Sequence, residues 1–277
     1  ISGYGIMYGY LNKRYYLDKF LSNRIIKILI PFIVTNILYI LGKVCIGNKY
    51  SFKEILVSFF NCSIMPNSWY MIVILIFYTT WYIIFCKYNK KTAIILISVF
   101  VFSYMILAYM IELGKWWYVS CAPFVIGIVW CNYCNLIFNF FRKNYFKVLP
   151  ILISLFCISY KFSIIISYLI NKNITTIIEV LTYILSTITF SIILIMLLMK
   201  LKFDNHILNF YGDISLELYL IHNLVIIILG RFGINNNFIF TILVFILSTI
   251  LAILLNKIFI TINKIKIYIT NEIYGIS

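Results

Sequence analysis

Three side chains suited to acid–base and hydrogen-bonding chemistry, Ser215, Tyr219 and His222, lie within a stretch of eight residues. Their spacing of i, i+4 and i+7 places them on one face of a helix over two turns. A histidine can take a proton from a hydroxyl group, and hydroxyl side chains can donate hydrogen bonds to a developing oxyanion. This face is therefore a candidate site. The alternative is that Ser215 and Tyr219 bond to neighbouring carbonyl groups and that His222 is a neutral interior histidine.

The residues around this face predict how it is held. Gly212 and Asp213 are typical of a turn and a helix N-cap, because an aspartate carboxylate accepts hydrogen bonds from backbone N–H groups of the first turn. Glu217 points away from the face. The run from Leu224 to Leu229 is wholly apolar. The helix must therefore continue into a membrane or a protein core, where a polar group without a partner is costly.

The composition of the chain is that of an integral membrane protein. Of its 277 residues, 64% are hydrophobic and 11% are charged, and the mean hydropathy is +1.02. These charges are too few to cover a soluble protein of this size. The net charge of +15 comes from Lys and Arg residues between apolar runs, so it indicates membrane orientation and contact with anionic lipid, and argues against nucleic-acid binding. The seven cysteines are scattered, and the Cys131–Cys134 pair has no neighbours that would complete a metal site.

Apolar runs of the length that spans a bilayer, roughly 17 to 25 residues, follow one another along the chain. They predict an all-α polytopic membrane protein with a single domain over residues 1–277. No internal repeat, linker or soluble domain is visible in the sequence. The eight predicted spans cover residues 25–41, 69–86, 92–111, 117–138, 146–169, 176–199, 214–230 and 238–260.

The basic residues alternate between the predicted loops. Sixteen Lys and Arg residues lie on one side of the predicted membrane, together with both ends of the chain, and six lie on the other side. The positive-inside rule therefore places both ends in the cytoplasm of a multi-pass protein of the cell membrane. The six residues predicted to be external are Lys43, Lys49, Lys53, Lys115, Lys172 and Arg231.

The N-terminal segment carries two cations and three glycines. Arg24 and Lys27 are one helical turn apart at the start of the first predicted span, a position typical of positive-inside anchors. Gly3, Gly5 and Gly9 have the wrong spacing for a dinucleotide-binding loop, and they predict close approach of helix backbones. Because the chain does not begin with Met and has no signal peptide, we expect it to be a fragment.

Aromatic pairs occur at both ends of the second predicted span. They are Trp69 with Tyr70 at its start, and Trp81 with Tyr82 farther on. Amphipathic rings of this kind favour the membrane–water interface in any membrane protein. On composition alone, both pairs are predicted to be interfacial anchors.

Four stretches of the sequence, in order, resemble acyltransferase family 3, the multispanning membrane enzymes that O-acylate surface polysaccharides and related acceptors. They are ISGYG with the basic segment after it, the Trp69–Tyr70 pair, WWYVSCAPFVIGI from Trp116, and YGDISLELYLIH from Tyr211. Where the family has R-x-x-R, this chain keeps Arg24 but has Lys27, which preserves charge and loses the planar guanidinium fork. In the family ISGYG ends the second membrane helix. The resemblance therefore implies that one or two helices precede this chain and that the whole protein has about ten.

The resemblance implies a membrane-bound O-acyltransferase. It would move an acyl group, expected to be acetyl, from a cytoplasmic acyl-CoA to a hydroxyl group of a cell-surface polysaccharide or a lipid-linked sugar, without a metal. The phosphates of the donor would bind to Arg24 and Lys27. The family's usual base is a histidine on its first membrane helix, which this sequence lacks, so we expect the chain by itself to be inactive.

The remaining candidate site residues divide into two groups. The tentative catalytic group is Ser215, Tyr219 and His222, and the residues expected on the acceptor or acyl path are Trp69, Tyr70 and Glu217. A competing prediction is a transporter or flippase of a glycan or small substrate, in which the same buried polar residues bind a substrate or relay protons without chemistry. The lack of an internal repeat argues against that class. A structural membrane subunit fits the composition but leaves the cluster of polar residues unexplained.

Overall fold

The computed structural model describes residues 2–169, 177–201, 205–234 and 236–274, and every secondary-structure element in these ranges is helical. This confirms the predicted all-α polytopic fold. The predicted loop residues Lys172, Lys202 and Asp204 lie outside the described residues. The α-helices are α1 (Ser2–Asn12), α2 (Ile26–Cys45), α3 (Phe52–Asn61), α4 (Trp69–Lys87), α5 (Lys90–Met110), α6 (Ala122–Asn132), α7 (Cys134–Leu169), α8 (Ile177–Lys200), α9 (His206–Asp213), α10 (Ser215–Leu229) and α11 (Asn237–Tyr274). The short helical turns are η1 (Leu21–Ile25), η2 (Pro66–Ser68), η3 (Lys115–Trp117) and η4 (Gly230–Phe232).

Seven of the described helical segments, and not eight, are long and apolar enough to cross a membrane. The predicted span at residues 117–138 is wrong as a continuous helix. It contains α6, whose 11 residues extend only about 17 Å, and it is interrupted at Tyr133 (φ −110°, ψ 27°). Pro123 lies in the first turn of α6, where its missing N–H group has no helical partner to lose, and not inside a membrane helix as predicted.

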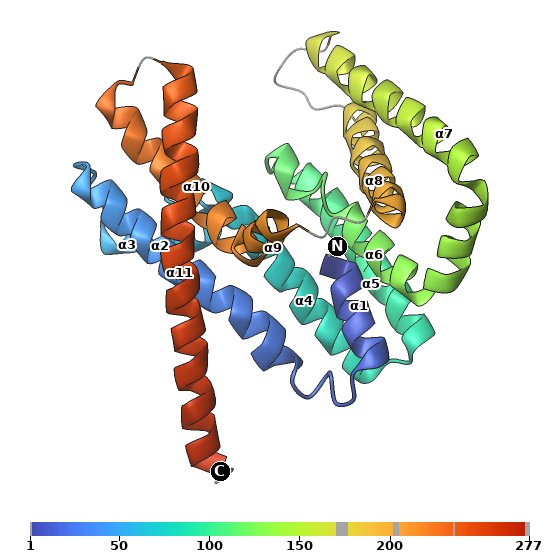
Figure 1. Ribbon diagram of the computed structural model, residues 1–277, viewed down its shortest axis with the longest axis horizontal. Helices are drawn as coiled ribbons and strands as arrows, with labels where there is room; N and C mark the ends of the chain where they lie inside the picture. The colour runs from blue at the N-terminus through green and yellow to red at the C-terminus, as the bar shows by residue number, and fades with distance from the viewer. Residues whose placement is uncertain (1, 170–176, 202–204, 235, 275–277) are drawn as a thin grey trace. The chain divides into compact units, whose positions relative to one another are not determined.

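Helix α7 replaces a predicted loop. The segment around Arg142 and Lys143 is helical, and the chain bends instead at Asn144, whose backbone angles (φ −110°, ψ 20°) are not helical (Figure 1). The Asn144 side chain donates a hydrogen bond to the Phe140 carbonyl group at 3.1 Å, which satisfies one acceptor at the bend. Composition predicted the apolar span after this bend correctly, but not the helix that leads into it.

The internal contacts of the chain divide it into two compact units. We call Ile1–Leu21 with Phe77–Phe203 the first unit, and Ser22–Ile76 with Asp204–Ser277 the second unit. The single domain over residues 1–277 stays a prediction. Each unit combines an N-terminal segment with segments far along the sequence, so each is closed by long-range packing.

In the first unit, α1 packs against α6 through glycines. A side-chain carbon at Gly3 would collide with the Phe124 carbonyl oxygen, and one at Gly127 would lie 2.7 Å from the Tyr4 backbone nitrogen. The prediction that glycines allow close backbone approach is therefore confirmed for Gly3. At Gly5 it is wrong, because nothing lies within 4 Å of the position of an added carbon.

An aromatic cluster in the first unit surrounds Trp81. This side chain is fully buried, stacks on Phe85 at a ring-centroid distance of 4.4 Å, and contacts Phe20 at 5.0 Å and Tyr10 at 5.9 Å. The prediction that Trp81 is an interfacial anchor is therefore wrong. Tyr10 of α1 and Phe20, which follows α1, cover the Trp81 ring. The sequence around Trp81 does not reveal these contacts.

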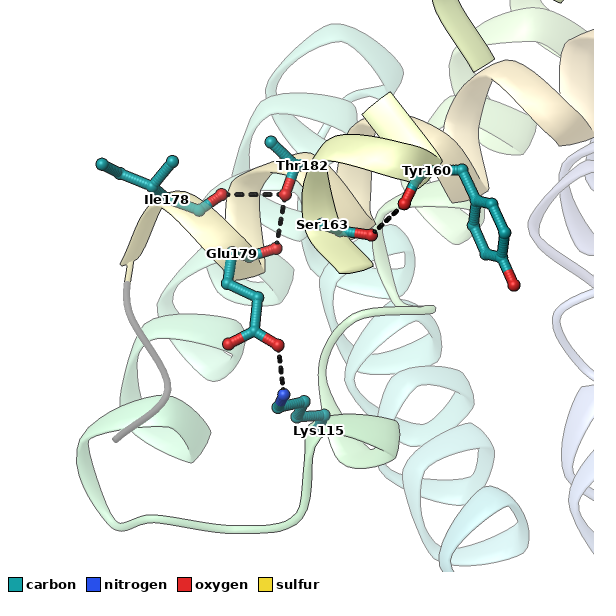
Figure 2. Close-up of polar contacts among 6 residues, drawn as sticks. All are labelled: Lys115, Tyr160, Ser163, Ile178, Glu179 and Thr182. Atoms are coloured by element: carbon teal, nitrogen blue, oxygen red, sulfur yellow. Dashed lines mark hydrogen bonds and ion pairs between the residues drawn. The ribbon is translucent and has the colours of Figure 1, made fainter. Parts of the chain in front are cut away.

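A buried ion pair connects α8 to the η3 turn. The Glu179 carboxylate accepts a hydrogen bond from Lys115 Nζ, and the Glu179 side chain is 3% exposed while that of Lys115 is 41% exposed (Figure 2). Lys115 Nζ also lies 5.8 Å from the centre of the Tyr183 ring. Glu179 belongs to the first turn of α8. The only acidic residue within the predicted span 176–199 therefore lies at the end of its helix, where Lys115 is its cationic partner.

Replacing Lys115 by alanine should lower the stability of the first unit. Breaking a fully buried pair costs about 3–5 kcal/mol because a charge is left uncompensated, and the exposure of Lys115 reduces this to roughly 1–3 kcal/mol. We expect the thermal unfolding midpoint of the purified protein in detergent to fall by several degrees. Adding Glu179→Gln should recover most of the loss, and the exposed Lys161→Ala in α7 should have no effect. An unchanged midpoint for Lys115→Ala would show that the pair contributes nothing.

The second unit is built around α10, which packs against α2 on one side and α11 on another. Figure 1 shows α11 as one long, continuous helix. The unpredicted helix α3 begins with a capping box: Ser51 Oγ accepts from the Glu54 N–H group, and the Ser51 N–H group donates to the Glu54 carboxylate at 2.7 Å. The Glu54 carboxylate accepts hydrogen bonds from the N–H group and from the hydroxyl group of Ser51, and these two bonds lower the pKa of the Glu54 carboxyl group.

Membrane sidedness can be tested with single cysteines introduced into a background without native cysteines. From the distribution of charge, we expect Lys90→Cys and Lys143→Cys to be protected from impermeant thiol reagents, and Lys49→Cys and Asn236→Cys to react from outside. Position 143 is the most informative. It is cytoplasmic only if the chain crosses the membrane between α5 and the bend of α7, despite the break at Tyr133. Reversed labelling at two of the four positions would contradict the predicted topology.

Candidate functional site

Two helices of the second unit form a cavity of about 390 Å³. Both contribute residues at helical spacing, so each helix presents one face to the cavity. The predicted face of Ser215, Tyr219 and His222 is found here. The residues that line the cavity are Ser215, Leu218, Tyr219 and His222 of α10, and Thr241, Val244, Phe245 and Ser248 of α11.

The hydrogen bonds of His222 define its tautomer. Its Nδ1 lies 3.1 Å from the Leu218 carbonyl oxygen, which can only accept, so Nδ1 carries the proton. Its Nε2 lies 3.4 Å from Asn67 Nδ2, which can only donate. His222 is therefore neutral in this arrangement, with the lone pair of Nε2 held by a long hydrogen bond. A group of this kind can accept a proton at Nε2 once the Asn67 amide is displaced.

Tyr219 is fixed by the same turn that contacts His222. Its hydroxyl group donates to the Asn67 carbonyl oxygen at 3.2 Å. Its ring packs edge to face against Tyr70 with centroids 5.5 Å apart, and its centroid lies 6.0 Å from that of His222. The structure thus brings together Tyr70, Tyr219 and His222, and Trp69 lies beside Tyr70 at the start of α4 with ring centroids 6.0 Å apart.

Asn67 is a residue beside this site that the sequence did not predict, as are the lining residues of α11. It lies in the η2 turn, and it contacts Tyr219 through its carbonyl group and His222 through its side chain. The Ser68 hydroxyl group secures the turn with a hydrogen bond of 2.6 Å to the Met65 carbonyl oxygen. The only local signal was a proline followed by two turn-forming residues before the Trp69–Tyr70 pair.

Ser215 lies at the first residue of α10, and its hydroxyl group donates to the Gly212 carbonyl oxygen at 2.9 Å. The prediction that Asp213 caps this helix is wrong. Asp213 is the last residue of α9, and α10 is preceded by Ile214, which makes no side-chain capping hydrogen bond. The N-cap of α9 is Asn205, whose side chain accepts from the Ile207 N–H group at 2.9 Å. The polar residues before α10 thus close one helix and do not open the next.

Glu217 does not line the cavity, in agreement with its position off the face of Ser215, Tyr219 and His222. The expectation that it lies on the acceptor or acyl path stays a prediction. Its side chain is buried in the second unit, and Oε1 accepts from Asn256 Nδ2 at 3.2 Å. Asn256 Nδ2 also lies 3.3 Å from the Asp213 carbonyl oxygen, while Oε2 of Glu217 has no hydrogen-bond partner among the described residues. Glu217 therefore joins α10 to α11 at a place separate from His222.

Helices α2 and α10 run parallel to each other. The paired positions increase in the same order along both helices: the Tyr39 hydroxyl group donates to the Leu220 carbonyl oxygen at 3.2 Å, and a side-chain carbon at Gly42, farther along α2, would lie 3.0 Å from Leu224 Cδ1, farther along α10. The contact residues on α10 point away from the cavity. One face of α10 therefore fixes the helix against α2, and another lines the cavity.

The cations Arg24 and Lys27 lie near the start of α2 and do not line the cavity. Lys27 precedes Tyr39 by twelve residues, about 18 Å along a helix, and Ser215 precedes Leu220 by five, about 8 Å. Because the helices are parallel, the two cations lie at the Ser215 end of the second unit, roughly 10 Å beyond it. An extended ligand could bind the cations at one end and reach the cavity with the other.

All of the predicted site residues belong to the second unit. The sequence did not reveal this shared location. The first unit has a larger cavity of about 450 Å³ between α6 and α8, but no histidine, carboxylate, lysine or arginine lines it. Among the residues that the structure describes, no group of three His, Cys, Asp or Glu side chains could hold a metal ion. The cavity of the second unit is therefore the candidate site.

Comparison with known proteins gives one match. A family model described as an acyltransferase domain matches residues 1–257. The match extends over both units and includes every predicted site residue. The comparisons with curated proteins and with solved structures found no match.

Proposed function

Because this chain belongs to acyltransferase family 3, we propose that it transfers an acyl group, expected to be acetyl, from a cytoplasmic acyl-CoA to a hydroxyl group of a cell-surface polysaccharide or a lipid-linked sugar. The observation that carries the proposal is the neutral His222 at the cavity of the second unit. Arg24 and Lys27 lie toward the same end of that unit as Ser215. In this proposal both ends of the chain are cytoplasmic, which requires one more crossing between α5 and α7 in addition to the seven helices of membrane-spanning length. The acceptor reaches the site through the membrane.

The proposed chemistry needs a base and no metal. The acceptor oxygen attacks the thioester carbonyl carbon, and His222 Nε2 takes the hydroxyl proton as the new C–O bond forms. The resulting oxyanion collapses, the C–S bond breaks, and the CoA sulfur leaves and takes the proton from His222. Hydrogen-bond donors near the oxyanion, among which Tyr219 and Ser215 are candidates, stabilise the intermediate.

The remaining predicted residues have supporting roles in this proposal. Arg24 and Lys27 bind the phosphates of the donor, since cationic side chains form charge-assisted hydrogen bonds with phosphate. Trp69 and Tyr70 line the acceptor or acyl path: the Tyr70 ring contacts Tyr219, and the Trp69 ring lies beside Tyr70. Glu217 fixes α10 against α11 and so positions His222 indirectly. The family's upstream histidine stays a prediction.

The test is transfer of label in membranes that contain the full-length protein. We expect radiolabel from acetyl-CoA to appear in the surface glycan or in a lipid-linked sugar, and to be absent from membranes without the protein. A folded protein that transfers no label from acetyl-CoA or from longer acyl-CoA thioesters would refute the proposal. Movement of unmodified glycan across the membrane would instead identify a transporter or flippase.

A further inference from the structure

Ser248 is an unusual residue of the α10–α11 cavity. Its side chain is 1% exposed, and its hydroxyl group has no hydrogen-bond partner among the described residues. It shares the cavity-lining face of α11 with Thr241, Val244 and Phe245. A buried hydroxyl group left without a partner costs about 1–3 kcal/mol, so its position at this cavity needs an explanation.

Other hydroxyl side chains of α11 donate hydrogen bonds to backbone carbonyl groups of the same helix. Thr241 Oγ1 donates to the Asn237 carbonyl oxygen, and Thr249 Oγ1 donates to the Phe245 carbonyl oxygen, each at 2.8 Å. Ser248 does not use this option, although it is the immediate neighbour of Thr249. A serine hydroxyl group changes direction by rotation between staggered positions about the Cα–Cβ bond. Such a rotation can turn the hydroxyl group of Ser248 toward a bound molecule.

The rest of the cavity wall indicates what that molecule is. Leu218, Val244 and Phe245 supply an apolar surface, and the volume of about 390 Å³ is well above the roughly 150 Å³ that suffices for benzene. The wall therefore suits a hydrocarbon chain longer than an acetyl group. A hydroxyl donor within such a wall suits a carbonyl oxygen, which can only accept.

We propose that this cavity is the pocket for the acyl group of the donor, and that the Ser248 hydroxyl group holds the thioester carbonyl oxygen while the chain lies against Leu218, Val244 and Phe245. This inference rests on the proposed acyltransferase function. It adds a substrate class, acyl groups longer than acetyl, and a binding residue contributed by α11. Held in this way, the carbonyl carbon lies in the same cavity as His222.

The test compares two probes that differ only in the acyl group, octanoyl-CoA and CoA, on the purified full-length protein. Ser248→Ala should weaken binding of octanoyl-CoA about two- to tenfold, the value of one neutral hydrogen bond, and leave CoA binding unchanged. Thr249→Ala is the matched control, because that hydroxyl group is satisfied within its own helix. It should alter neither affinity and should not raise the thermal unfolding midpoint. Ser248→Ala should keep or raise the midpoint of the parent protein, because it removes a buried hydroxyl group that has no partner among the described residues.

Three outcomes would overturn this inference. Ser248→Ala could leave octanoyl-CoA binding unchanged, or it could weaken octanoyl-CoA and CoA equally. A photoreactive phosphatidylcholine could label the residues around Ser248 without competition from octanoyl-CoA, which would assign the cavity to membrane lipid. Failure of the proposed function is separable from all three. Binding of octanoyl-CoA that depends on Ser248, without transfer of label to any acceptor, would refute the transferase proposal and leave the acyl pocket intact.

Discussion

Replacement of His222 by alanine in the full-length protein should lower the rate of acyl transfer by about a hundred- to ten-thousandfold, the usual contribution of a positioned general base. The expectation rests on the pair of contacts that leave Nδ1 protonated and Nε2 as the acceptor. Donor binding should change little, because the cations that meet the phosphates lie elsewhere on α2. The measurement is the initial rate of label transfer at saturating acetyl-CoA, together with the affinity for acetyl-CoA.

The matched control is the other histidine of the chain. His206 is exposed at the first residue of α9 and does not line the cavity. His206→Ala should therefore transfer label at the parental rate. Equal rates for His222→Ala and the parent, with normal amounts of folded protein, would remove His222 from the chemistry. The histidine that the family resemblance implies upstream would then be the remaining candidate for the base.

Arg24→Ala should weaken the binding of acyl-CoA roughly tenfold to over a hundredfold, since a hydrogen bond to a charged group contributes about 1.5 to 3 kcal/mol. CoA without an acyl group should lose the same factor, because the lost contact is with phosphate. Lys27→Arg should bind at least as tightly as the parent, because it restores the planar fork that suits phosphate. The measurement is equilibrium binding to the purified protein.

Lys43→Ala provides the matched control for Arg24. Lys43 belongs to the last turn of the same helix, so it is a cation of α2 at the opposite end. Its removal should leave acyl-CoA binding unchanged. If Arg24→Ala and Lys43→Ala weakened binding equally, general electrostatic attraction would explain the effect, and the assignment of a phosphate site to Arg24 would fail.

Features that depend on local periodicity were predictable from the sequence. The shared face of Ser215, Tyr219 and His222 follows from helical spacing alone, and in the structure this face lines a cavity. The start of α3 was also readable, because Ser51 and Glu54 have the spacing of a capping box. Hydropathy does not indicate this helix, because it is short and lies between long apolar runs.

Features that depend on distant contacts were not predictable. Asn67 approaches Tyr219 across 152 positions of sequence, and nothing near Asn67 indicates that its carbonyl group has this partner. Trp81 is buried by the rings of Phe20 and Tyr10, which lie about 60 to 70 positions earlier in the sequence. The residues next to Trp81 do not reveal these contacts, and the Trp81–Tyr82 pair alone is typical of a membrane interface. Ser248 looked like one more small residue in an apolar run, because the absence of a hydrogen bond is visible only in three dimensions.

The glycine contact between α1 and α6 joins parts of the chain that are synthesised at different times. Helix α6 begins 110 positions after α1 ends, and a ribosome that adds roughly 5 to 20 residues per second needs about 6 to 22 s to cover that interval. Throughout it, the surface of α1 around Gly3 must be covered by lipid or by another helix. The arrival of α6 therefore sets the earliest moment at which α1 can pack within the first unit, and slower translation lengthens the period in which other proteins can bind the exposed surface of α1.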